Sequence, residues 1–194
     1  MTDSPPGAAG APLAQPLHEY LRGHAQGNPE GVACIWYGHT ITWAELDRTS
    51  DAFAARLQAL GVKKGDPVAL FLNNCPQYLM AHFGIQKMGA IVCPCGPLNK
   101  EHELQYQLGD LQARVIVAAE SLLPVVDKVR AQTALQHVFV VRYAELLPEA
   151  PAIDVPAELL ALRAAAAPAP AGCEDFLATV RASGSPAPVQ IAMD

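Results

Sequence analysis

Four apolar runs decide the fold: VALFL at 68–72, AIVC at 90–93, RVIVAA at 114–119 and HVFVV at 137–141. They begin 22, 24 and 23 residues apart, and a segment with helix signals separates each run from the next. A buried strand of about 5 residues, a helix of about 12 and two short loops fill this spacing. The runs predict repeated strand–helix units, and their continuous apolar character is typical of parallel strands covered on both faces.

Helix start and stop residues lie between these runs. Thr42 followed by Glu45 forms the capping-box pattern, and Gly61 suits the left-handed residue that ends a helix. Pro76 suits the first turn of a second helix and Gly89 its end. Weaker signals predict further helices: one at 17–22, one capped by Asn99 with Glu101 and Glu103 in its first turn, one capped by Ser121 and running to Val129, and two at 158–163 and 174–181.

A β-hairpin is predicted before the first long helix, with strands at 32–37 and 40–43 on either side of Gly38 and His39. The fold class is therefore α/β: a doubly wound, mainly parallel sheet flanked by helices, with a small β-hairpin.

Proline and glycine mark the two ends of the predicted domain. Residues 1–16 contain neither Lys nor Arg and no apolar core, which predicts a flexible lead rather than a signal peptide. We expect residues 17–147 to form the α/β subdomain. Residues 148–194 read as a Pro- and Ala-rich connector and the start of the next subdomain, with Val189–Met193 approaching another strand.

Composition excludes some partners and leaves others open. The net charge of −6 offers no basic field for nucleic acid. The longest uncharged stretch, 67–86, contains Asn, Gln, His and Pro, so no membrane span is expected, and the protein is predicted to be cytoplasmic. With 51% hydrophobic and 16% charged residues, the chain either exposes an apolar face that another segment normally covers or is simply enriched in Ala. An uncovered face would favour self-association.

Five cysteines at irregular positions predict free thiols in a reducing compartment. Cys93 and Cys95 are predicted to be structural, with a metal site that includes His82 or His102 as the alternative. The sequences His18-Glu19 and His102-Glu103 resemble the start of a zinc-protease helix. Neither is followed by the second histidine that such a site needs, because Arg22 and Tyr106 stand at those positions.

The sequence contains neither GxGxxG nor GxxxxGK[ST], so the usual phosphate-binding loops are absent from it. The segment Gly61–Gly65 with its two lysines is predicted to be a turn. Ser183 and Ser185 are also assigned to a turn, since no GxSxG motif is present. The acidic cluster of Glu45, Asp47 and Asp51 is predicted to be a solvated helix face.

Five strings in a fixed order resemble the amino-terminal part of the acyl-adenylate-forming enzymes, the superfamily of acyl-CoA synthetases, adenylation domains and beetle luciferase. The resemblance in order and spacing covers residues 17 to about 145, and the last string most resembles bacterial fatty-acyl-CoA ligases. The strings are TWAEL at 42–46, GVKKGD at 61–66 with VAL at 68–70, NCPQ at 74–77, GAIV at 89–92 with Pro94, and KEHELQYQL at 100–108.

The resemblance implies an AMP-forming fatty-acid–CoA ligase that uses ATP, Mg²⁺ and coenzyme A, acting on a medium- or long-chain fatty acid. In that family the phosphate loop, the ribose-binding acid and the lysine of the mobile lid all follow the region seen here. The sequence therefore names no catalytic, cofactor-binding or metal residue, and no tightly bound cofactor is expected.

The expectation is an amino-terminal fragment that supports one side of the active-site cleft and is inactive alone. Two alternatives stay open: a non-catalytic α/β binding or interaction module, and an acyl-AMP ligase that loads a carrier protein. The sequence does not fix the acyl chain length or the oligomeric state.

Overall fold

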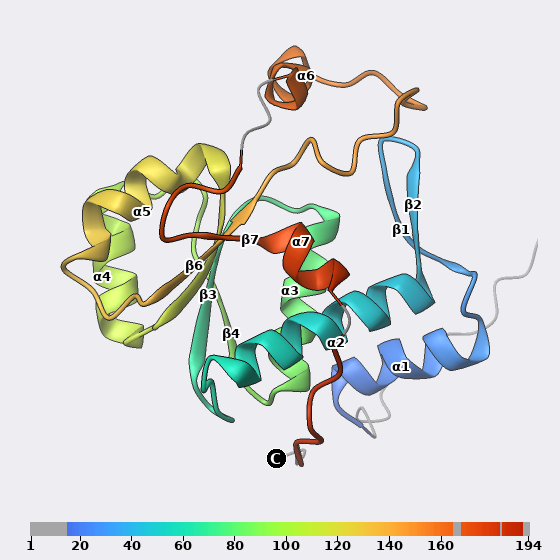
Figure 1. Ribbon diagram of the computed structural model, residues 1–194, viewed down its shortest axis with the longest axis horizontal. Coiled ribbons are helices and arrows are strands. Elements are labelled where there is room, and N and C mark those ends of the chain that lie inside the picture. Colours follow the sequence, from blue (N-terminus) through green and yellow to red (C-terminus); the bar gives the residue numbers. More distant parts are fainter. Residues whose placement is uncertain (1–14, 165–167, 183, 192–194) are drawn as a thin grey trace, which may run out of the picture.

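The computed structural model describes residues 15–164, 168–182 and 184–191. Its main feature is a sheet of five parallel strands in the order β4-β3-β5-β6-β7, with helices on both faces (Figure 1). The strands are β3 (Pro67–Phe71), β4 (Ile91–Pro94), β5 (Val115–Ala119), β6 (His137–Val141) and β7 (Glu174–Asp175). The four predicted runs lie side by side in parallel, which confirms the α/β class. Most of the predicted flexible lead, residues 1–14, lies outside the described residues.

Alternate residues of the central strands face two separate cores. Val68, Leu70 and Leu72 contribute to one core, and Ala69 and Phe71 to the other. The neighbouring strands follow the same alternation: 115, 117, 119, 139 and 141 face the first core, and 116, 118, 138 and 140 face the second. Burial on both faces explains why these strands read as continuous apolar runs.

Each core is closed by its own layer of helices. The first core is covered by α2 (Trp43–Ala59), α3 (Pro76–Lys87) and α7 (Phe176–Arg181). The second is covered by α4 (Glu101–Leu111) and α5 (Leu123–Arg130), on the opposite side of the sheet in Figure 1. The chain places β4 on one side of β3 and then returns to place β5 on the other. This reversal is the doubly wound topology predicted from the sequence.

The amino-terminal elements lie against α2. Helix α1 (Leu17–Gly27) continues past the predicted end at residue 22. The hairpin is confirmed as β1 (Val32–Trp36) and β2 (His39–Thr42), but its turn is Tyr37-Gly38 and not Gly38-His39. Both turn residues have positive φ, 50° and 99°, as a tight turn between twisted strands requires.

The predicted helix cap at Thr42 is confirmed, whereas those at Asn99 and Ser121 are wrong. The Thr42 hydroxyl accepts a hydrogen bond from the Glu45 amide at 3.2 Å, and Gly61 is left-handed. Helix α4, however, is capped by Lys100, whose amide donates to Glu103, while the Asn99 side chain donates to Gln107. Ser121 lies inside a 3-10 turn (Glu120–Leu122) that leads into α5.

Pro94 is the last residue of β4. The amides of Ile91 and Cys95 donate hydrogen bonds to the carbonyls of Asp66 and Leu70. Backbone nitrogens alternate in direction along a strand, so the nitrogen of Pro94 points away from β3. Because β4 is an edge strand, a proline there loses no ladder hydrogen bond.

The last described segments correct two further predictions. Glu174 and Asp175 form the short strand β7 beside β6, and only 176–181 is helical. Residues 189–191 form no strand, and 192–194 lie outside the described residues. The predicted helix near 158–163 is confirmed as α6 (Ala157–Ala164).

Helices α2 and α3 pack closely through a glycine and a buried lysine. A Cβ atom on Gly84 would lie 2.9 Å from the Ser50 carbonyl oxygen and 2.9 Å from Phe53 Cδ1. Lys87 Nζ lies 2.6 Å from Asp47 Oδ1 and 2.7 Å from Asp51 Oδ1. The prediction that Asp47 and Asp51 form a solvated face is therefore wrong, since both carboxylates neutralise a lysine on the neighbouring helix.

Replacing Gly84 by Ala is expected to lower the free energy of unfolding by about 1–3 kcal/mol, because the added methyl group meets a backbone oxygen that cannot move aside. Gly109→Ala in α4 is the matched control: a Cβ there meets nothing within 4 Å. It should raise stability by about 0.5–1 kcal/mol. Urea unfolding followed by circular dichroism measures both, and equal effects at the two sites would contradict the close packing of α2 and α3.

Lys87→Met is expected to destabilise the fold by about 3 kcal/mol, because it leaves two aspartates without their buried cation. This is the lower end of the range for breaking a buried ion pair, since both aspartates keep some contact with water. The control Lys63→Met removes an exposed lysine from the turn before β3 and should change stability by less than about 0.5 kcal/mol. The same urea titration compares the two, and a Lys87 variant as stable as the control would show that the ion pair contributes nothing.

Candidate functional site

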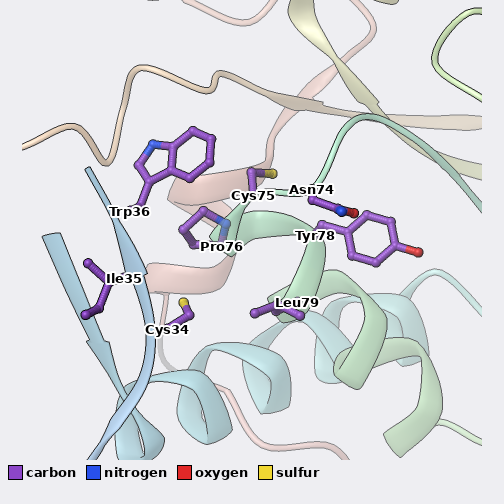
Figure 2. Close-up of a pocket in the computed structure, with 8 residues that line it drawn as sticks. All are labelled: Cys34, Ile35, Trp36, Asn74, Cys75, Pro76, Tyr78 and Leu79. Carbon is purple, nitrogen blue, oxygen red and sulfur yellow. The ribbon is translucent and has the colours of Figure 1, made fainter. Parts of the chain in front are cut away.

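The carboxyl ends of the parallel strands carry a groove near the point where the strand order reverses. Ligands of open α/β sheets commonly bind at such a point. The loop after β3 leads through Asn73 and Asn74 into α3, and β1 of the hairpin lies opposite. Figure 2 shows residues 34–36 of β1 on one side of the resulting groove and residues 74–79 on the other.

The groove has a volume of about 440 Å³ and a mainly apolar lining. A smaller cavity of about 250 Å³ shares Trp36 and Asn74 with it and extends to α6, where Leu159 and Leu162 close it. The two hollows therefore adjoin at the Trp36 side chain. Their lining is mainly apolar and includes the aromatic rings of Trp36, Tyr78 and Tyr143. Its polar side chains include Asn73, Asn74 and Glu158, so it suits an apolar group with a polar end.

Tyr143 connects three chain segments at this edge. Its hydroxyl accepts a hydrogen bond from the Asn73 amide at 2.7 Å, and its carbonyl accepts one from Trp36 Nε1 at 3.1 Å. Gln77, which is fully buried, donates to the Arg142 carbonyl at 3.1 Å. These bonds hold the loop after β3, the hairpin and the segment after β6 in a fixed relation.

A buried arginine lies at the same edge. The Arg142 guanidinium contacts Glu120 at 3.3 Å, Glu145 at 3.0 Å and Asp175. Glu120 follows β5, Glu145 lies in the segment after β6, and Asp175 belongs to β7. The arginine therefore joins the ends of three strands. Burial raises the pKa of the Glu145 carboxyl, against the opposing effect of Arg142. The arrangement is a structural clamp, because all three anions bind the cation directly.

The cysteines near the groove are poor nucleophiles. Burial raises the pKa of Cys75 to about 12 and also raises that of Cys34. Because the thiolate is the reactive form, neither thiol is activated at neutral pH.

Cys93 and Cys95 are buried, and their thiols donate weakly to the carbonyls of Ile91 and Cys93. Burial raises the pKa of both, that of Cys95 to about 11. Within the described residues, no group of three or more His, Cys, Asp or Glu side chains could hold a metal ion.

The remaining sequence candidates lie away from this groove. Gly61–Gly65 forms a turn, as predicted, with φ of 76° and 85° at its two glycines. His18 pairs with Glu19 on α1. Ser183 lies outside the described residues, and Ser185 lines a different cavity, between α1 and α3.

Sequence reasoning did not identify Trp36, Tyr143 and Arg142. A charged residue directly after a buried strand was the available signal for Arg142, which follows HVFVV at 137–141. Nothing local marks Trp36, because its partner Tyr143 lies 107 residues further along the chain.

The comparison with known families identifies the family to which the chain belongs. A family model described as AMP-binding enzyme matches residues 21–185. The chain belongs to this family. The match includes the hairpin, the five parallel strands and α7, so the predicted resemblance is confirmed.

Relatives within the AMP-binding enzymes are similar over the same region. The long-chain-fatty-acid–CoA ligase of Bacillus subtilis (strain 168) is 34% identical over 132 residues, which cover 68% of this chain and 24% of the relative. The ligase of the same name from Escherichia coli O6:H1 is 43% identical over 116 residues, 59% of this chain and 21% of the relative. The chain thus spans about a quarter of the length of these curated relatives.

A solved structure of the family shows the same fold. The crystal structure of the anthranilate CoA ligase AuaEII in complex with anthranoyl-AMP matches with a TM-score of 0.72 at 22% identity, over 93% of this chain and 30% of that one. No helix in the described part of this AMP-binding family member is long and apolar enough to cross a membrane.

Tyr143→Phe is expected to lower the free energy of unfolding by about 0.5–1.5 kcal/mol, because the Asn73 amide loses its hydrogen-bond acceptor. Tyr106→Phe is the matched control, since that side chain lies on the outside of α4 and Tyr106 is 70% exposed. Hydrogen exchange at the Asn73 amide should accelerate in the first variant only. Unchanged exchange there would mean that Tyr143 does not fix the loop after β3.

Proposed function

We propose that this chain forms the amino-terminal part of an AMP-forming fatty-acid–CoA ligase. The observation that carries the proposal is the family match over 21–185, together with 43% identity to a bacterial long-chain-fatty-acid–CoA ligase. The substrates proposed for the whole protein are a long-chain fatty acid, ATP and coenzyme A. A cytoplasmic location is part of the proposal, supported by five cysteines that are all free thiols.

The proposed reaction has two steps. The fatty-acid carboxylate attacks the α-phosphate of ATP and releases pyrophosphate, which leaves an acyl adenylate. The coenzyme A thiol then attacks the acyl carbonyl and releases AMP. Mg²⁺ would offset charge on the phosphates in the whole enzyme, but no described residue of this chain is assigned to holding it.

The role proposed for this chain is to position one wall of the cleft. Its parallel strands all end at one edge, where Tyr143, Gln77 and Arg142 hold the loops in place. The groove between β1 and α3 lies at that edge. We retain the division into a subdomain at 17–147 and a connector at 148–194 as a prediction for the whole protein.

A chimera tests the proposal. The chain replaces the matching segment of the Bacillus subtilis ligase, and formation of palmitoyl-CoA is measured with ATP, Mg²⁺, palmitate and coenzyme A. Turnover is expected, because the two segments share the fold and the edge that supports the cleft. The remainder of the ligase without this segment serves as the control and should be inactive.

The isolated 194-residue chain should form no AMP above the blank in the same assay. Turnover by the isolated chain, or a chimera that folds but does not turn over, would contradict the proposed role.

A further inference from the structure

Helix α1 is attached to the body of the protein through a narrow contact. Of its eleven residues, all of them described, only His18 and Leu21 are buried, at 6% and 2% exposure. At its far end, the exposed His24 stacks on Trp43 with ring centres 4.7 Å apart. An imidazole is therefore one of the two buried side chains of α1.

His18 lies beside a network of charged groups at the junction of three helices. On α1, its Nε2 atom lies 3.3 Å from Glu19 Oε1, and Arg22 binds Asp51 at 3.1 Å. On α2 the charged groups are Asp47 and Asp51, and on α3 there is the buried Lys87. A cavity of about 250 Å³ lies here, and the segment 185–189, which has no charged side chain, closes it.

The existing pairs already compensate the aspartates. Lys87 Nζ binds Asp47 Oδ1, Asp51 Oδ1 and the Asp47 carbonyl, and Arg22 binds Asp51 as well. Glu19 is the carboxylate nearest to the imidazole, but it is also 3.7 Å from Arg22 and faces water. A proton on His18 would add a third cation to a junction of three carboxylates, and its only carboxylate within 4 Å, Glu19, is shared with Arg22.

Burial is the larger effect on His18. It lowers the pKa of the imidazole, Glu19 opposes this change, and Arg22 and Lys87 reinforce it. The docked helix therefore binds the proton less well than the undocked helix does. By linkage, docking is fully stable above the ordinary histidine pKa and weakens as the pH falls below it.

We propose that α1 is a pH-sensitive latch, docked against α2 and α3 while His18 is neutral and released locally when His18 is protonated. Release would expose the charged junction and the cavity beneath 185–189 while the sheet stays folded. The five-stranded sheet contains one histidine among the described residues, His137 at the start of β6. Burial also lowers the pKa of the half-buried His82 on α3, so the comparison with β5 separates release of α1 from a wider effect. The latch does not depend on the proposed ligase reaction.

Hydrogen exchange of the 194-residue chain tests the latch. Protection of peptides covering 17–27 is compared at about pH 7.5 and about pH 5.5, with exchange times scaled for the intrinsic rate, and peptides covering β5 serve as the internal reference. A several-fold loss of protection in α1 at the lower pH is expected, with β5 unchanged. Protection that stays constant or rises at the lower pH would overturn the proposal.

Two substitutions on the same helix assign the effect to one side chain. His18→Gln should make the protection of α1 independent of pH, whereas the exposed His24→Gln should leave the loss intact. If His18→Gln undocks α1 at every pH, His18→Met supplies a neutral apolar side chain of similar length, and its α1 should be docked at both pH values. A pH effect that persists in the docked His18→Met variant would overturn the assignment.

Discussion

The fold depends on keeping both faces of one parallel sheet away from water. In β3, β5 and β6 the side chains alternate between two cores, so neither face can be left to solvent. One helix layer cannot cover both faces, and a chain of strand–helix units reaches the second face only by reversing its direction across the sheet. The reversal occurs around β3, which has β4 on one side and β5 on the other. A groove at the carboxyl edge follows from this arrangement.

Buried polar groups then fix the position of the layers. Lys87 joins α3 to α2, and Arg142 joins the ends of β5, β6 and β7. Because the acidic partners of each cation lie on other elements, α2 for Lys87 and three strand ends for Arg142, a shift of one element would leave a buried charge without its partner. Apolar packing alone tolerates such shifts more readily. His18 differs from these two because its charge depends on pH, and it lies under α1, where Leu21 is the other buried residue.

The sequence was sufficient to predict the sheet because its signal is local. Each run is apolar apart from Arg114 and His137, which open the third and the fourth. Glycines such as Gly61 and Gly89 mark helix ends with the positive φ that the structure shows. Cap prediction failed at Asn99 and Ser121 because several neighbouring residues can satisfy a helix start, and tertiary contacts decide between them. Asn99 is engaged by Gln107 instead.

The candidate site was harder to predict because it is made of distant partners. Asp47 reads as a surface residue until Lys87, 40 positions away, is known to lie beside it. Trp36 and Tyr143 lie 107 residues apart in the sequence and meet only in the tertiary structure. Tertiary structure, and not local pattern, brings these side chains together.

The most direct test of the account is a nuclear magnetic resonance measurement on the 194-residue chain. If this chain alone forms the sheet that reverses around β3, Val68 must show close contacts to both Val92 and Val115, its partners on the two sides. Both sets of nuclear Overhauser effects are predicted. A chain that lacks either set, or in which β4 lies next to β5, would contradict the account.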